Sequence, residues 1–178
     1  MRDPVIHVVN GLLAAGLLAA SVLAWFGLPD VIPVHFDLAG NPDRWARTSL
    51  VSWFALPVLA MGLTAFLYLV AAWLPGHPRW LNFPGKERYL ELPRRERAPV
   101  DRVIRSILHG SGTLVLVLFG VIQLLVYRQA TGLDPGWLPA LILILALGSG
   151  PAIAGVALVR LQRALDVAWR RHRAAGGG

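Results

Sequence analysis

The chain has 178 residues, of which 56% are hydrophobic and only 15% are charged, and its mean hydropathy is +0.57. Soluble domains carry about 25% charged and about 45–50% apolar residues, so this composition excludes a soluble enzyme built around one aqueous core. The sequence contains no cysteine, which excludes disulfides, thiolate metal sites and cysteine nucleophiles. The formal net charge is +7 and the pI is near 11.2; the positions of the basic residues decide what that charge means.

The apolar residues fall into four long blocks, which predict transmembrane helices over 5–28, 50–74, 103–127 and 137–159. Each block exceeds the roughly 20 residues with which a helix crosses about 30 Å of hydrocarbon. None shows the alternation of a barrel strand. The sequence therefore predicts an all-α membrane protein with four transmembrane helices in a single domain, 1–178.

The first block reads as a retained helix and not as a cleaved signal peptide. It is longer than a usual signal core, and its basic lead is Arg2 alone, beside Asp3.

Orientation follows from the basic residues. Fourteen of the 17 Lys and Arg residues fall at the N-terminus, in the connection 75–102 with its membrane edge, and in the tail 160–178. Only three fall in the other two connections. The positive-inside rule then puts both termini in the cytoplasm and the connection 29–49 outside. The high pI is thereby explained by topology and by contact with anionic lipid, and nucleic acid is not an expected partner.

The cytoplasmic segments are expected to lie at the membrane surface. Aromatic and leucine residues interleave with charges in 75–102, which suits a segment along the headgroups, with its acidic residues paired to nearby arginines. The tail 160–178 begins as an amphipathic extension of the fourth helix. Pro57 and the run 148–151 are expected to bend the second and fourth helices.

The connection 29–49 is predicted to form an extended arm folded over the bundle. Apolar and polar residues alternate in its first half, and Gly40-Asn41-Pro42 is a turn signal. We expect its apolar side chains to pack down on the helices, namely Val34, Phe36 and Trp45. We expect its polar side chains to gather facing water, namely His35, Asp37 and Asp43.

Three interpretations of this cluster remain open: a structural lid, in which Asp43 caps a turn or pairs with Arg44 or Arg47; a surface that recognises a ligand or peptide; and a metal or hydrolytic site. One His and two Asp offer no diagnostic metal spacing. The motifs of membrane hydrolases are missing from the sequence, so no catalytic residue, metal site or cofactor is predicted. The candidate recognition residues are His35, Phe36, Asp37, Asp43, Arg44 and Trp45.

Two histidines lie inside the predicted spans, where ionisable side chains are costly and suggestive. Both His7 and His109 fall about 4–6 Å inside the same boundary at 1.5 Å per residue, so they could meet. They form either a proton-titrating pair or two separate side chains bonded near the interface. Small residues along the first helix, such as Gly11 and Ala15, are expected to pack inside the bundle, and a homo-oligomer remains open.

The outer connection carries a recognisable motif, LPDVIPVHFDLAGNPDRW. It resembles the signature of the bacterial membrane family known as the domain of unknown function numbered 1648, which also begins the SdpI-like immunity proteins. The stretch 80–87 is similar to the segment that follows the second helix in that family. The residues that carry the first resemblance are Pro29, Ile32, Pro33, His35, Phe36, Gly40, Pro42, Asp43 and Trp45.

This resemblance implies a multi-pass protein of the bacterial cytoplasmic (inner) membrane. We expect a non-enzymatic role in envelope stress or in immunity to, or sensing of, antimicrobial peptides, with the outer arm as the recognition element. Expected partners are the lipid bilayer and a peptide toxin or another membrane protein. The alternative is a small permease or an accessory subunit of a transport complex.

Overall fold

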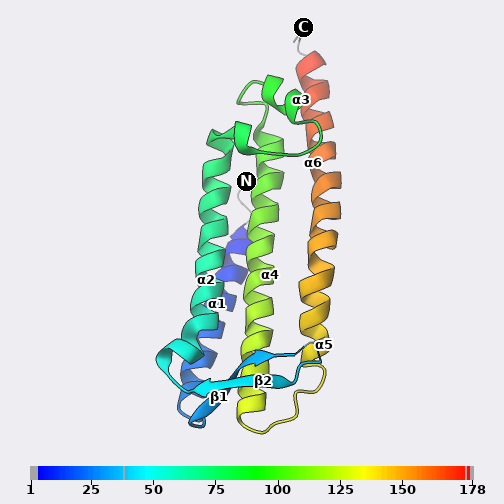
Figure 1. Cartoon of the computed structure of the whole chain (residues 1–178). Coiled ribbons are helices and arrows are strands. Elements are labelled where there is room, and N and C mark those ends of the chain that lie inside the picture. The colour runs from blue at the N-terminus through cyan, green and yellow to red at the C-terminus, as the bar shows by residue number, and fades with distance from the viewer. Residues whose placement is uncertain (1–3, 38, 175, 177–178) are drawn as a thin grey trace.

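A computed structural model describes residues 4–37, 39–174 and 176. Four helices stand side by side, and each is long and apolar enough to cross a membrane (Figure 1). They are α1 (Pro4–Trp25), α2 (Leu50–Trp73), α4 (Ala98–Ala130) and a fourth that runs from α5 (Leu138–Leu143) through a π-helical turn (Ile144–Gly148) into α6 (Ser149–Ala174). The four predicted spans are thereby confirmed. Arg2 and residues 175, 177 and 178 of the predicted tail lie outside the described residues.

Two helices extend well beyond the predicted apolar blocks. The block 103–127 belongs to a helix that begins at Ala98 and ends at Ala130. The block 137–159 belongs to one that continues to Ala174, as the predicted extension of the fourth helix into the tail requires. Hydropathy marks only the lipid-facing part of a helix, so it ends where charged residues begin although the backbone hydrogen bonds continue. The π-helical turn ends at Gly148, the first residue of the run 148–151, where the sequence predicted a bend.

The tail 160–178 does not lie along a membrane surface as predicted. Helix α6 continues in one direction past the apolar band, and Leu165 and Ala168 on it are buried. They pack against the short helix α3 (Lys86–Glu91) and the first turns of α4 (Figure 1). This core, here called the α3 cluster, consists of Leu81, Tyr89, Leu92, Val100, Ile104, Leu165 and Ala168. Because α3 covers it, the apolar side of the tail needs no lipid surface.

The connection 29–49 folds as a β-hairpin across the opposite end of the bundle (Figure 1). Strand β1 (Val31–Phe36) pairs antiparallel with β2 (Pro42–Arg47). The register slips between Pro33 and His35, so that Val34 stands out of the ladder as a bulge.

The predicted packing of this segment is wrong for two of its three apolar side chains. Val34 is 41% exposed and Trp45 is 47% exposed, whereas Ile32 and Pro33 are buried. The bulge explains the error, because it shifts the strand's inward and outward alternation by one residue. Phe36 does pack inward, as predicted.

The hairpin is anchored by a small core at the helix ends. Ile32 packs with Trp53 and Val126, and all three are buried. The indole Nε1 of Trp53 donates to the Ser21 carbonyl at 2.8 Å, and the Gln123 amide donates to the Trp53 carbonyl at 3.2 Å. Helices α1, α2 and α4 are therefore tied together beneath the hairpin.

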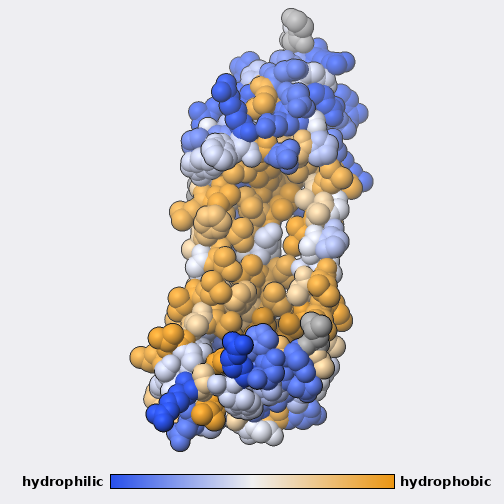
Figure 2. Space-filling view, in the orientation of Figure 1, coloured by the Kyte–Doolittle hydropathy of each residue, from blue (hydrophilic) through white to orange (hydrophobic). Residues whose placement is uncertain are grey.

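The small residues of α1 do not pack inside the bundle, contrary to prediction. Gly11, Ala15 and Gly16 are all exposed, and a Cβ added at either glycine would meet nothing within 4 Å. The close approach is made elsewhere, because Gly112 of α4 lies against Thr64 of α2. These small residues are therefore exposed on the outer surface of α1. Figure 2 shows an apolar band between two polar ends of the molecule.

Candidate functional site

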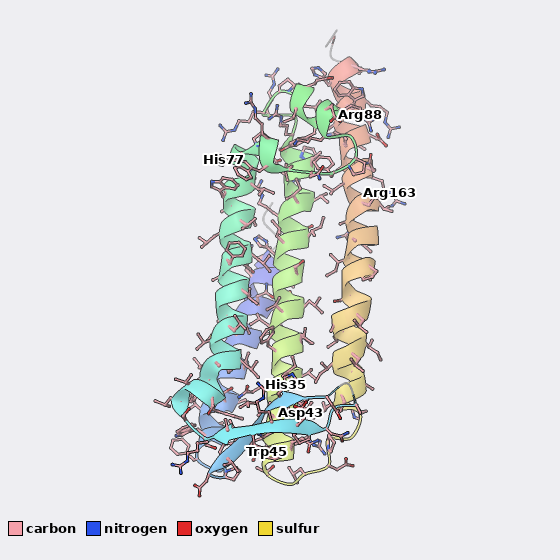
Figure 3. The ribbon with its side chains drawn as sticks, viewed as in Figure 1. His35, Asp43, Trp45, His77, Arg88 and Arg163 are labelled. Carbon is pink, nitrogen blue, oxygen red and sulfur yellow. The ribbon has the colours of Figure 1, made fainter. Side chains whose placement is uncertain are left out.

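A group of exposed polar side chains lies on the hairpin. His35 on β1 and Asp43 on β2 face each other, and His35 Nδ1 is 2.6 Å from Asp43 Oδ1 (Figure 3). Their side chains are 57% and 48% exposed. The predicted proximity of these two residues is confirmed. Within the described part of the chain, Asp43 pairs with neither Arg44 nor Arg47, so that form of the lid interpretation is wrong.

Asp37 lies at the hairpin turn and has a different role from Asp43. Its carboxylate accepts a hydrogen bond from the Asn41 backbone N–H at 2.8 Å and a longer one from the Asn41 amide at 3.3 Å. The pKa of the Asp37 carboxyl is lowered, chiefly because that backbone N–H stabilises the charged form. Asp37 is therefore a fixed negative charge that also holds the turn closed.

A cavity of about 300 Å³ opens between the hairpin and the helices beside it. His35 and Asp37 stand at its polar rim, and the remaining lining is mostly apolar and comes from β1, α4 and α5. The lining residues are Val34, His35, Phe36, Asp37, Gly40, Ile122, Leu125, Pro139, Ile142 and Leu143. We call this the hairpin pocket.

Gly40 fixes how the hairpin closes over this pocket. It is buried and has a φ of +83°, a conformation that side chains other than glycine rarely adopt. A Cβ at this position would overlap the ring of Pro139 at the start of α5. The turn thus requires glycine at position 40 for two reasons: the backbone conformation and the close contact with α5.

The remaining predicted recognition residues are partly outside the pocket. Phe36 lines it, but Asp43, Arg44 and Trp45 on β2 do not and are exposed on the hairpin's surface. Figure 3 shows Asp43 and Trp45 there. No group of three or more His, Asp or Glu that could hold a metal ion exists among the described residues. An apolar pocket with an acidic rim is suited to an amphipathic group that carries positive charge.

The two histidines within the spans do meet. The ring centroids of His7 and His109 are 4.8 Å apart, and Tyr68 of α2 contacts both. The Tyr68 hydroxyl lies 3.1 Å from His7 Nδ1 and accepts a hydrogen bond from Asn10 at 3.0 Å. Asn10 also accepts from the Thr113 hydroxyl at 2.6 Å. A polar network therefore connects α1, α2 and α4 inside the apolar band.

Sequence reasoning missed Tyr68, which joins the two histidines. The available signal was its position, since it is the only tyrosine in the predicted span 50–74 and has apolar neighbours on both sides. Aromatic residues with a hydroxyl usually mark span ends, and this one lies inside.

A third polar contact lies in the α3 cluster and was also missed. The Tyr89 hydroxyl donates to the Asp101 carboxylate at 2.6 Å, and the Arg97 guanidinium lies over the Tyr89 ring at 5.2 Å. Burial and the Asp101 carboxylate raise the pKa of Tyr89 well above its usual range. The sequence predicted that Asp101 would pair with an arginine, but no arginine among the described residues lies within ion-pair distance of it.

Four membrane-length helices with an apolar band between two polar ends define a multi-pass membrane protein. Residues 12–61 match the family model described as Domain of unknown function (DUF1648), which confirms the resemblance carried by the hairpin motif. The match covers most of α1, the whole hairpin and the first half of α2. No curated protein and no solved structure matches the chain.

Proposed function

We propose that this protein is a non-enzymatic recognition protein of the bacterial inner membrane, and that it binds a membrane-active cationic peptide in the hairpin pocket. The observation that carries the proposal is the pocket itself, which joins an apolar floor to a rim with the fixed negative charge of Asp37. A membrane-active peptide has apolar residues for the floor and basic residues for the rim. Immunity and sensing both need such a binding step.

The positive-inside distribution of arginines supports an outward-facing hairpin, where an external peptide would arrive first. Asp43 does not line the pocket, but its 2.6 Å contact with His35 Nδ1 orients the imidazole that does. Arg44 and Trp45 extend the same surface on β2. Trp45 is suited to contact a ligand because it is a large, exposed aromatic side chain.

The experiment is survival of sensitive bacteria challenged with melittin as the probe peptide. Cells express the native chain, His35→Ala, Asp37→Asn or Asp43→Asn, after each has been shown to reach the membrane. Matched controls are Asp30→Asn, an exposed carboxylate without a hydrogen bond among the described residues, and His77→Ala at the opposite end of the bundle (Figure 3).

The native chain and both controls should protect the cells, and the variants at His35, Asp37 and Asp43 should not. Protection that survives all three hairpin substitutions would contradict the proposal. If the native chain gives no protection, the proposed immunity to this class of peptide is contradicted.

A second candidate function is a small permease or transport accessory subunit, and one observation favours it. The fourth helix contains the π-helical turn Ile144–Gly148, and its most apolar stretch has no buried residue. π-helical turns within α-helices often lie at functional sites. Under this alternative, substitutions at Pro57, Gln123, Gly150 and Pro151 would abolish function and the hairpin variants would retain it.

A further inference from the structure

Helix α6 stands apart from α4 over the middle of the bundle. The two helices are joined at one end by the α3 cluster and at the other by the contacts of α5. Between these ends a cleft of about 310 Å³ opens sideways, at the depth of the apolar band (Figure 2). Its lining consists of Ser106, Ile107, Gly110, Ser111, Ala152, Ile153, Val156, Ala157 and Arg160.

The two serines in this cleft leave it apolar. The Ser106 hydroxyl donates to the Val103 carbonyl, and the Ser111 hydroxyl donates to the Ile107 carbonyl, both within α4. Both hydroxyl protons are therefore engaged within α4 and are not offered to a ligand. The remaining polar group in the lining is the guanidinium of Arg160.

Arg160 has no hydrogen-bond or ion-pair partner among the residues that the structure describes. The one acidic residue of α6, Asp166, pairs with Arg88. A guanidinium at the edge of hydrocarbon is costly unless an anion neutralises it. The part of the chain that the structure describes supplies no such anion to Arg160.

The position of Arg160 matches the depth of a lipid phosphate. The apolar run of the fourth helix ends at Val159, so Arg160 stands where hydrocarbon gives way to headgroups. The rest of the cleft runs from there toward Ile153, which is about 10 Å along the helix at 1.5 Å per residue. If the phosphate of a phospholipid binds Arg160, an acyl chain of the same lipid would lie along this path. Basic pockets between transmembrane helices bind anionic headgroups in this way.

We propose that the α4–α6 cleft binds one anionic glycerophospholipid, with its phosphate on Arg160 and an acyl chain between Ala157, Ile153 and the facing turn of α4. The lipid completes the bundle by filling the space that α6 leaves beside α4. This site is independent of the hairpin pocket, because Arg160 lies toward the opposite side of the membrane.

The test is native mass spectrometry of the full chain, purified in detergent and incubated with equal amounts of phosphatidylglycerol and phosphatidylcholine. The native chain should retain one phosphatidylglycerol. Arg160→Gln should reduce this occupancy about tenfold or more, as expected for the loss of a hydrogen bond between charged groups. Arg163→Gln is the matched control, because Arg163 lies on the same helix, carries the same charge and points away from α4 (Figure 3).

A second pair of variants tests the acyl chain's place. Ala157→Phe fills the cleft and should reduce the occupancy, whereas Ala154→Phe adds the same volume on the exposed side of α6 and should leave it unchanged. Equal losses from Arg160→Gln and Arg163→Gln would overturn the proposal, as would equal retention of phosphatidylcholine. A lipid-free dimer that Ala157→Phe dissociates would show that a second copy fills the cleft instead.

Discussion

At the scale of single residues, the His35–Asp43 pair differs in kind from the contacts of Trp53. The pair is about half exposed, and exposed ion pairs contribute only about 0–1 kcal/mol to stability. Trp53 is 1% exposed, and its indole N–H donates a hydrogen bond to the Ser21 carbonyl. The first contact is therefore free to serve recognition, and the second holds the fold.

Replacing Trp53 by Phe should destabilise the protein. The Ser21 carbonyl would lose its buried donor, which costs about 1–3 kcal/mol, and a void would form beside Ile32. Thermal unfolding of the purified protein in detergent measures the loss. Trp45→Phe is the control, because Trp45 is 47% exposed and its change should stay within about 0.5 kcal/mol. Equal melting temperatures for the two variants would refute the assigned role of Trp53.

At the scale of elements, the hairpin depends on its turn. Gly40→Ala should cost at least about 2 kcal/mol, because it combines a left-handed backbone with an overlap against Pro139. Gly132→Ala isolates the first effect, since Gly132 has a φ of +74° but nothing within 4 Å of an added Cβ. The melting temperature of Gly40→Ala should therefore be well below that of Gly132→Ala. Similar losses would mean that the Pro139 contact does not hold the turn.

The α3 cluster should make stability fall at alkaline pH. The pKa of Tyr89 is raised in the folded state, so the fold favours the neutral phenol. That contribution is complete below pH about 10, the unfolded pKa of tyrosine, and is lost as the pH rises above it. Chemical denaturation at pH 8 and pH 11 tests this. The native chain should lose more stability between the two pH values than Tyr89→Phe does.

Tyr127→Phe is the control for this measurement, because it removes a phenol from the hairpin end and leaves the Tyr89–Asp101 contact in place. It should lose as much stability as the native chain over the same pH range. An identical alkaline loss in Tyr89→Phe and in the native chain would assign the effect to other groups.

Elements whose order is local were predictable from sequence. Apolar length gave the four helices, and the Gly40-Asn41-Pro42 turn predicted that His35 and Asp43 would approach. The bulge at Val34 was not predictable, because the register is set by Ile32 packing into the helix ends, which is a contact between distant segments.

The same reason explains the other errors. The tail lies against α3 because Leu165 finds a buried place among residues far away in the chain. Tyr68 joins His7 to His109 only once three helices have packed, so no local pattern in α2 could indicate the network. Contacts between helices, and not the helices themselves, escaped prediction.

At the scale of the whole molecule, two polar ends separated by an apolar band require that the hairpin and the α3 cluster lie on opposite sides of the membrane (Figure 2). The basic residues favour the hairpin as the outer end. Recognition of an external peptide requires that orientation.

Cysteine labelling in intact cells tests this orientation most directly, because the chain contains no cysteine of its own. Ala39→Cys places a thiol at the exposed hairpin turn, and Arg94→Cys places one at the exposed edge of the opposite end. A membrane-impermeant maleimide should label the first variant in intact cells and the second only after the cells are permeabilised. Labelling of Arg94→Cys but not Ala39→Cys in intact cells would place the hairpin inside and contradict its role as an external recognition element.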